Sequence, residues 1–106
     1  MLIFGLKEEI VQKIKEIFAQ FEEVEEVIVY GSRAMGNFRN GSDLDLTIKG
    51  QKMNVGIVNK ISIKIDDLYL PYLFDISVYH QITNLELIDH IERVGKVFYE
   101  KHLIEI

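Results

Sequence analysis

Three aspartates in this sequence could carry chemistry, and two of them stand close together. Asp43 and Asp45 begin the segment 43–48, in which polar and apolar residues alternate, so both carboxylates lie on one face of a predicted strand. Asp75 lies in the similar alternating segment 74–78. Neighbouring carboxylates repel each other unless a cation lies between them, and oxygen ligands suit a hard divalent ion such as Mg2+. We therefore predict a magnesium site at Asp43 and Asp45, with Asp75 as the third carboxylate.

The turn that follows the apolar segment 27–30 could bind an anion. The β-branched residues of that segment predict a buried strand. Gly31 and Ser32 interrupt it with a tight turn, and we expect Ser32 to cap a short helix there. Backbone N–H groups of such a turn, together with the Ser32 hydroxyl, are suited to phosphate. A phosphate site facing a metal-binding carboxylate pair is what phosphoryl or nucleotidyl transfer requires.

The order of these residues resembles a known signature. Gly31-Ser32, ten further residues and then Asp43-x-Asp45 is similar to the motif of the nucleotidyltransferase superfamily related to DNA polymerase beta. Within it, Gly-Ser-Arg-Ala followed by Gly-Asn-Phe-Arg-Asn-Gly-Ser-Asp-Leu-Asp-Leu resembles the minimal nucleotidyltransferases (MNT). These are short prokaryotic proteins commonly paired with a HEPN-domain protein. The resemblance covers nearly the whole chain.

The resemblance implies a Mg2+-dependent transferase that uses ATP and moves AMP onto a hydroxyl of a protein partner, with the chain as antitoxin of a HEPN toxin. Asp43 and Asp45 would hold two Mg2+ ions, and Asp75 would ligate one ion and act as the general base. The residues expected to contact the nucleotide phosphates are Gly31, Ser32, Arg33 and Ser42.

The sequence is also compatible with two other functions. The chain could be a binding module that neutralises its partner by covering it, and Met35, which stands where many relatives carry a basic residue, keeps this hypothesis open. It could also be a small-molecule nucleotidyltransferase, although such enzymes need an added acceptor-binding region. An Asp43→Asn variant separates the first alternative from the enzyme.

Length and composition indicate a globular protein of a single domain. The 106 residues predict one domain, 1–106, and a content of 48% hydrophobic and 27% charged residues is ordinary for a globular chain. Twelve basic and seventeen acidic residues give a net charge of −5, so we expect no direct DNA or RNA partner. No apolar run approaches the roughly 18 residues of a membrane span, no cysteine is present, and we expect a cytoplasmic protein with no membrane partner.

The remaining segments predict the elements that position the site. Apolar residues at helical spacing predict helices over 6–21 and 53–67. Thr83 and Glu86 predict a capping box that opens another helix, which Gly95 ends. A last strand is expected at 96–99. We predict a small α/β nucleotidyltransferase fold, with a mixed sheet of three to five strands and helices packed on one side.

Two features fall outside that scheme. His80, His90 and His102 share no ligand spacing, so we expect no zinc site. The tail 103–106 is apolar, and we hypothesise that it lies in an interface with a second copy of the chain or with the partner.

Overall fold

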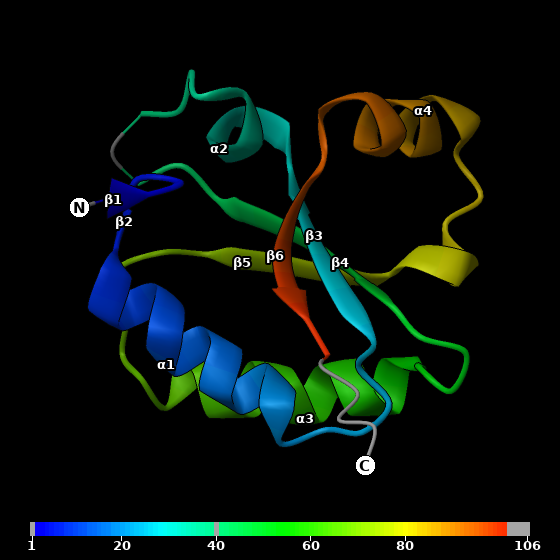
Figure 1. Ribbon diagram of the computed structural model, residues 1–106, viewed down its shortest axis with the longest axis horizontal. Helices are drawn as coiled ribbons and strands as arrows, with labels where there is room; N and C mark the ends of the chain where they lie inside the picture. Colours follow the sequence, from blue (N-terminus) through cyan, green and yellow to red (C-terminus); the bar gives the residue numbers. More distant parts are fainter. Residues whose placement is uncertain (1, 40, 102–106) are drawn as a thin grey trace, which may run out of the picture.

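The computed structural model of the protein describes residues 2–39 and 41–101 (Figure 1). The helices are α1 (Glu8–Ala19), α2 (Gly31–Met35), α3 (Val55–Asp66), the short 3-10 helix η1 (Tyr79–Gln81) and α4 (Leu85–Val94). The strands are β1 (Leu2–Ile3), β2 (Leu6–Lys7), β3 (Glu26–Tyr30), β4 (Leu44–Lys49), β5 (Phe74–Val78) and β6 (Lys96–Glu100). None of the helices in the described residues is long and apolar enough to cross a membrane.

The larger sheet contains four strands in the order β5-β4-β3-β6, and β1 and β2 form a separate hairpin. β4 pairs with β5 in parallel and with β3 in antiparallel orientation, and β6 pairs antiparallel with the other edge of β3. The predicted α/β class with a mixed sheet is therefore confirmed.

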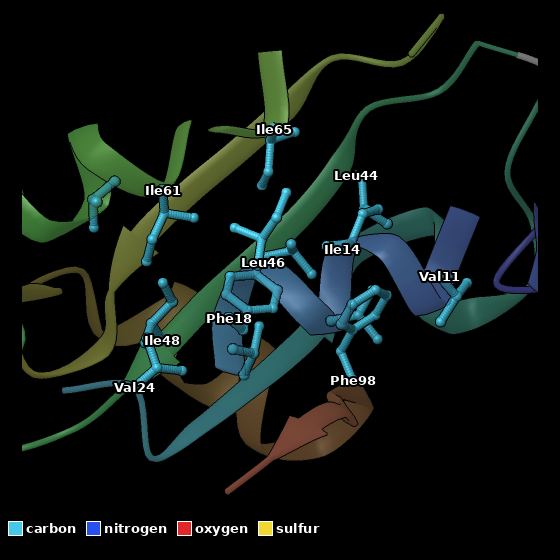
Figure 2. Close-up of a cluster of buried hydrophobic side chains, with 14 of the residues drawn as sticks. Val11, Ile14, Phe18, Val24, Leu44, Leu46, Ile48, Ile61, Ile65 and Phe98 are labelled. Carbon is cyan, nitrogen blue, oxygen red and sulfur yellow. The ribbon is translucent and has the colours of Figure 1, made fainter. Parts of the chain in front are cut away.

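The main core lies between this sheet and helices α1 and α3 (Figure 2). Leu44, Leu46 and Ile48, which alternate along β4, are fully buried in it. Phe18 of α1 also lies there, with its ring edge-on to that of Phe98 on β6. Because side chains alternate across a strand, burying Leu44 and Leu46 turns Asp45 to the opposite face.

That opposite face carries a smaller apolar cluster, in which Ile91 of α4 packs against Ile28 and Tyr30 of β3. Helices α2 and α4 therefore lie on one side of the sheet while α1 and α3 lie on the other (Figure 1). The sequence predicted that the helices pack on one side of the sheet. This holds for α1 and α3 but not for α2 and α4 (Figure 1). A Cβ atom at Gly95 would lie closer than 3.0 Å to Ile28 Cγ2, so the end of α4 lies directly against β3.

The caps of the helices differ from the predicted ones. Asn84, and not Thr83, caps α4, because its side chain accepts a hydrogen bond of 3.1 Å from the Leu87 N–H. Asn54 caps α3 in the same way through the Ile57 N–H. Ser32 does not cap α2; the residue in the capping position is Tyr30, which makes no side-chain cap.

The N-terminal residues also differ from the prediction. The helix expected from Leu6 begins at Glu8, because Leu6 and Lys7 form β2 and pair with β1. Phe4 and Gly5 adopt positive φ angles of 54° and 77° in the turn of this hairpin. The hypothesis for the apolar tail 103–106 concerns residues outside those that the structure describes.

Candidate active site

Asp45 and Asp75 lie side by side on neighbouring strands. They are register partners in the parallel pairing of β4 with β5, so their side chains point to the same face of the sheet. Asp45 is half-buried, whereas Asp75 is exposed. Asp43 is exposed and precedes the first residue of β4. The structure thus brings together Asp45 and Asp75, which the sequence places thirty residues apart.

The electrostatics of this face centre on Asp45. Burial raises the pKa of Asp45 above its ordinary value, and the negative charges of Asp75 and Asp43 raise it further. The imidazole of His90 acts on the pKa of Asp45 in the opposite direction, with a smaller effect. Like charges that perturb one another in this way create a site where a cation is favoured, because a cation would remove their repulsion.

The donors available at this position are carboxylate oxygens, which suit a hard divalent cation and not a zinc ion bound by histidine or cysteine. Within residues 2–39 and 41–101, however, no group of three or more His, Cys, Asp or Glu side chains has an arrangement that could hold a metal ion. The chemistry of the donor set therefore fits Mg2+, while the convergence of Asp43, Asp45 and Asp75 on one ion stays a prediction.

Gly31 forms the turn that connects β3 to α2 above these carboxylates. Its φ angle is +73°, in the left-handed region that favours glycine. A Cβ atom at residue 31 would also lie closer than 3.0 Å to Asp45 Oδ2. The backbone conformation therefore favours glycine here, and a side chain at residue 31 would have to displace the Asp45 carboxylate, which lies directly against the turn.

His90 of α4 is a residue of this site that the sequence prediction missed. The Gly31 N–H donates a hydrogen bond of 3.2 Å to His90 Nε2. The imidazole also lies edge-on to the ring of Tyr30, with 6.1 Å between the ring centroids. In the sequence, His90 directly precedes Ile91, which is expected to face inward from its helix, and this position is a weak signal that His90 lies near the sheet.

Arg33, which was expected to contact a phosphate, instead donates hydrogen bonds to backbone carbonyl oxygens. Its side chain is buried, with Nε and Nη2 donating to the Ser42 carbonyl oxygen at 3.0 and 2.9 Å and Nη1 donating to the Phe4 carbonyl oxygen at 2.9 Å. The guanidinium carbon lies 5.0 Å from the centre of the Phe38 ring and 5.1 Å from that of Tyr72. These contacts tie the N-terminal hairpin to the connection before β4, and the phosphate role of Arg33 stays a prediction.

Ser42 also serves the connection before β4. In addition to the carbonyl that receives Arg33, its hydroxyl oxygen accepts a hydrogen bond of 2.8 Å from the Arg39 N–H. Its own N–H donates to the Arg39 carbonyl oxygen, so two hydrogen bonds join residues 39 and 42. The contact of Ser42 with a nucleotide stays a prediction.

Comparison with known proteins identifies a family. The family model described as "Polymerase beta, Nucleotidyltransferase" matches residues 12–103. That range includes the turn at Gly31, the three aspartates and His90. No protein with a curated function gives a significant sequence match.

Three solved structures share the fold. A toxin-antitoxin crystal structure with AMP-PNP matches with a TM-score of 0.69 and 14% identity, over 86% of this chain and 73% of that chain. The toxin-antitoxin MntA-HepT gives 0.65 and 11%, over 90% and 74%. The tri-AMPylated HEPN toxin of Shewanella oneidensis in complex with MNT antitoxin gives 0.64 and 12%, over 88% and 71%. At these identities the likeness shows the fold alone.

Proposed function

This chain belongs to the polymerase beta nucleotidyltransferase family, and we propose that it transfers AMP from ATP to a hydroxyl group of a protein partner. One observation carries the proposal: Asp45 and Asp75 are paired across β4 and β5, directly beside the turn at Gly31. A carboxylate pair next to a backbone turn is the arrangement that metal-assisted transfer of a nucleotide requires.

Mg2+ would be held by Asp43, Asp45 and Asp75, and when bound it supplies positive charge that neutralises the phosphates and polarises the reacting phosphoryl group. Carboxylate oxygens are the ligands that suit this ion. The raised pKa of Asp45, which follows from its burial and from the charges of Asp75 and Asp43, supports a cation at this position.

The residues of the chain would position the triphosphate and accept a proton. The turn at Gly31 permits close approach because residue 31 has no side chain, and Ser32 offers its hydroxyl as a phosphate donor. The acceptor hydroxyl oxygen would form a bond to the α-phosphorus while the bond from that phosphorus to the bridging oxygen of pyrophosphate breaks. Asp75, which is exposed on β5, would take the hydroxyl proton, and pyrophosphate would leave.

A HEPN-domain protein is the partner that we propose. All three similar structures are described as toxin-antitoxin assemblies, and one of them contains an AMPylated HEPN toxin next to an MNT antitoxin. A likeness of fold supports this role for the chain, which would then be an antitoxin that modifies its toxin. Neutralisation by binding alone is the second candidate, since no group of three metal-holding side chains is arranged in the described residues.

The test uses ATP labelled at the α-phosphate, Mg2+, this chain and a purified HEPN-domain protein as the acceptor. Label should move to the HEPN protein, and Asp43→Asn or removal of Mg2+ by a chelator should abolish the transfer. Asp89→Asn is the matched control, because Asp89 is exposed on α4 and pairs only with Arg93 among the described salt bridges. If no label moves, or if Asp43→Asn transfers as well as the wild type, the proposal is wrong. Neutralisation that survives in Asp43→Asn would instead support the binding module.

A further inference from the structure

His90 makes a contact with the candidate active site that neither the predicted mechanism nor the family motif uses. It lies on α4, fifty-nine residues from Gly31, and its Nε2 accepts the Gly31 N–H at 3.2 Å. Gly31 opens α2, where a backbone N–H has no partner within the helix. The residue in the capping position, Tyr30, makes no side-chain cap, so an imidazole from another helix satisfies this donor.

The hydrogen bond determines which ring nitrogen of His90 carries the proton. A nitrogen that accepts a hydrogen bond must have a free lone pair, so Nε2 is unprotonated and Nδ1 carries the hydrogen. The ring orientation is set by a second contact, because Tyr30 meets the imidazole edge-on at an interplanar angle of 80°. Packing of Ile91 against Ile28 and Tyr30 fixes the helix that carries His90.

Gly31 is therefore held from two directions. On one side its N–H is bound by His90, and on the other its α-carbon lies against the Asp45 carboxylate, with no space for a side chain. A shift of the Gly31 peptide would change the separation between the turn and the carboxylates. Small displacements of this kind reduce the rate of a reaction that depends on alignment.

We propose that His90 is a positioning residue of the active site, which holds the Gly31 turn in register with Asp45 through its Nε2. This inference rests on the proposed function for its effect on catalysis, while the hydrogen bond and the tautomer can be measured without any ligand. The spacing of residues in the sequence does not reveal this role of His90. α4 comes close to the Gly31 turn because it packs on the face of the sheet opposite α1 and α3 (Figure 1).

Two variants separate the hydrogen bond from the bulk of the ring. His90→Gln places an amide oxygen close to the position of Nε2 and can still accept the Gly31 N–H, whereas His90→Leu cannot. If His90→Leu does not fold, His90→Asn replaces it, because the shorter amide does not reach the position of Nε2. His80→Leu is the matched control. Nε2 of His80 likewise contacts the backbone, in this case the Met53 carbonyl oxygen at 3.1 Å, but at the opposite end of β5 from Asp75.

The first measurement is nuclear magnetic resonance of the free protein at about pH 8, where an ordinary histidine is neutral. Nitrogen–hydrogen correlation spectra should show the Nδ1–H tautomer for His90. The Gly31 amide should exchange with solvent roughly tenfold faster in His90→Leu than in the wild type, in His90→Gln and in His80→Leu. A protonated Nε2 in the wild type, or equal exchange of Gly31 in all four proteins, would overturn the inference whether or not the chain transfers AMP.

The second measurement is the rate of AMP transfer to the HEPN protein. We expect His90→Leu to lower kcat by about tenfold or more. We expect His90→Gln to restore most of the rate. A wild-type kcat in His90→Leu, or a change confined to KM, would overturn the positioning role. Absence of transfer by the wild type would count against the proposed function, and the amide measurement would then decide alone whether His90 holds the turn.

Discussion

Gly31 and Asp45 are in direct steric contact: the turn after β3 leaves no room for a side chain between its backbone and the Asp45 carboxylate. Two strands that run antiparallel create this contact, because Tyr30, the last residue of β3, is the register partner of Asp45. The next residue must then turn away immediately above the carboxylate. The same contact explains why a glycine with a positive φ angle occupies position 31.

Gly31→Ala should destabilise the protein and abolish transfer, because it adds a clash with Asp45 to the cost of a positive φ angle. That backbone cost alone is roughly 1–2 kcal/mol. Gly36→Ala is the matched control: Gly36 has a φ angle of +82°, but no atom lies within 4 Å of its added Cβ. Denaturant unfolding should show a larger loss of unfolding free energy for Gly31→Ala. Equal losses for the two variants would contradict the steric contact.

Asp45→Asn should stabilise the free protein at neutral pH. Burial and the charges of Asp75 and Asp43 raise the pKa of Asp45, so ionising it costs more in the folded chain than in the unfolded chain. The stability that this group contributes is fully present below its unfolded-state pKa, about 3.9, and is lost as the pH rises through the raised pKa of the folded state. Urea unfolding should therefore show a gain for Asp45→Asn at pH 7 that shrinks towards about pH 4.

The control for this measurement is Asp66→Asn, because Asp66 is exposed at the end of α3 and outside the site. A gain for Asp45→Asn that does not depend on pH, or a loss, would contradict the electrostatic account. Adding Mg2+ should lower the pKa of Asp45 in the wild type, as seen in its carboxyl carbon resonance, and Asp75→Asn should lower that pKa in the absence of metal.

Arg33→Lys should lower the free energy of unfolding by about 2–4 kcal/mol, because an ammonium group cannot donate to the Ser42 and Phe4 carbonyls together as the guanidinium does. The comparison is Arg39→Lys, at an exposed position, which should change stability little. Denaturant unfolding and binding of ATP with Mg2+ are measured on both. Loss of ATP binding with unchanged stability would instead support the predicted phosphate contact of Arg33.

Asn84→Ala should cost about 1 kcal/mol of stability, since the Asn84 side chain satisfies the Leu87 N–H at the start of α4. Thr83→Ala should have a much smaller effect, although the sequence pattern favours Thr83 as the cap. Thermal and denaturant unfolding of the two variants distinguish the assignments. A larger loss for Thr83→Ala would show that the capping box forms.

Features that depend on short-range periodicity could be predicted from the amino-acid sequence. The alternation of Asp45 with Leu44 and Leu46 fixed which side chains of β4 face the core, because successive residues of a strand point to opposite faces. The motif from Gly31 to Asp45 placed the chain in its family, which the match over residues 12–103 then confirmed. Helix ends were less certain, since adjacent residues such as Thr83 and Asn84 compete for the same backbone donor.

Which distant residues meet at the site follows from the way the chain folds. The pairing of β4 with β5 set Asp75 beside Asp45, and a shift of one residue would have turned Asp75 to the other face. The docking of α4 brought His90 to Gly31, and the fold directed Arg33 to two backbone carbonyls. These contacts depend on strand register and on how helices pack over the sheet. Strand register and helix packing both depend on contacts between distant parts of the chain. No local pattern in the sequence predicts such contacts.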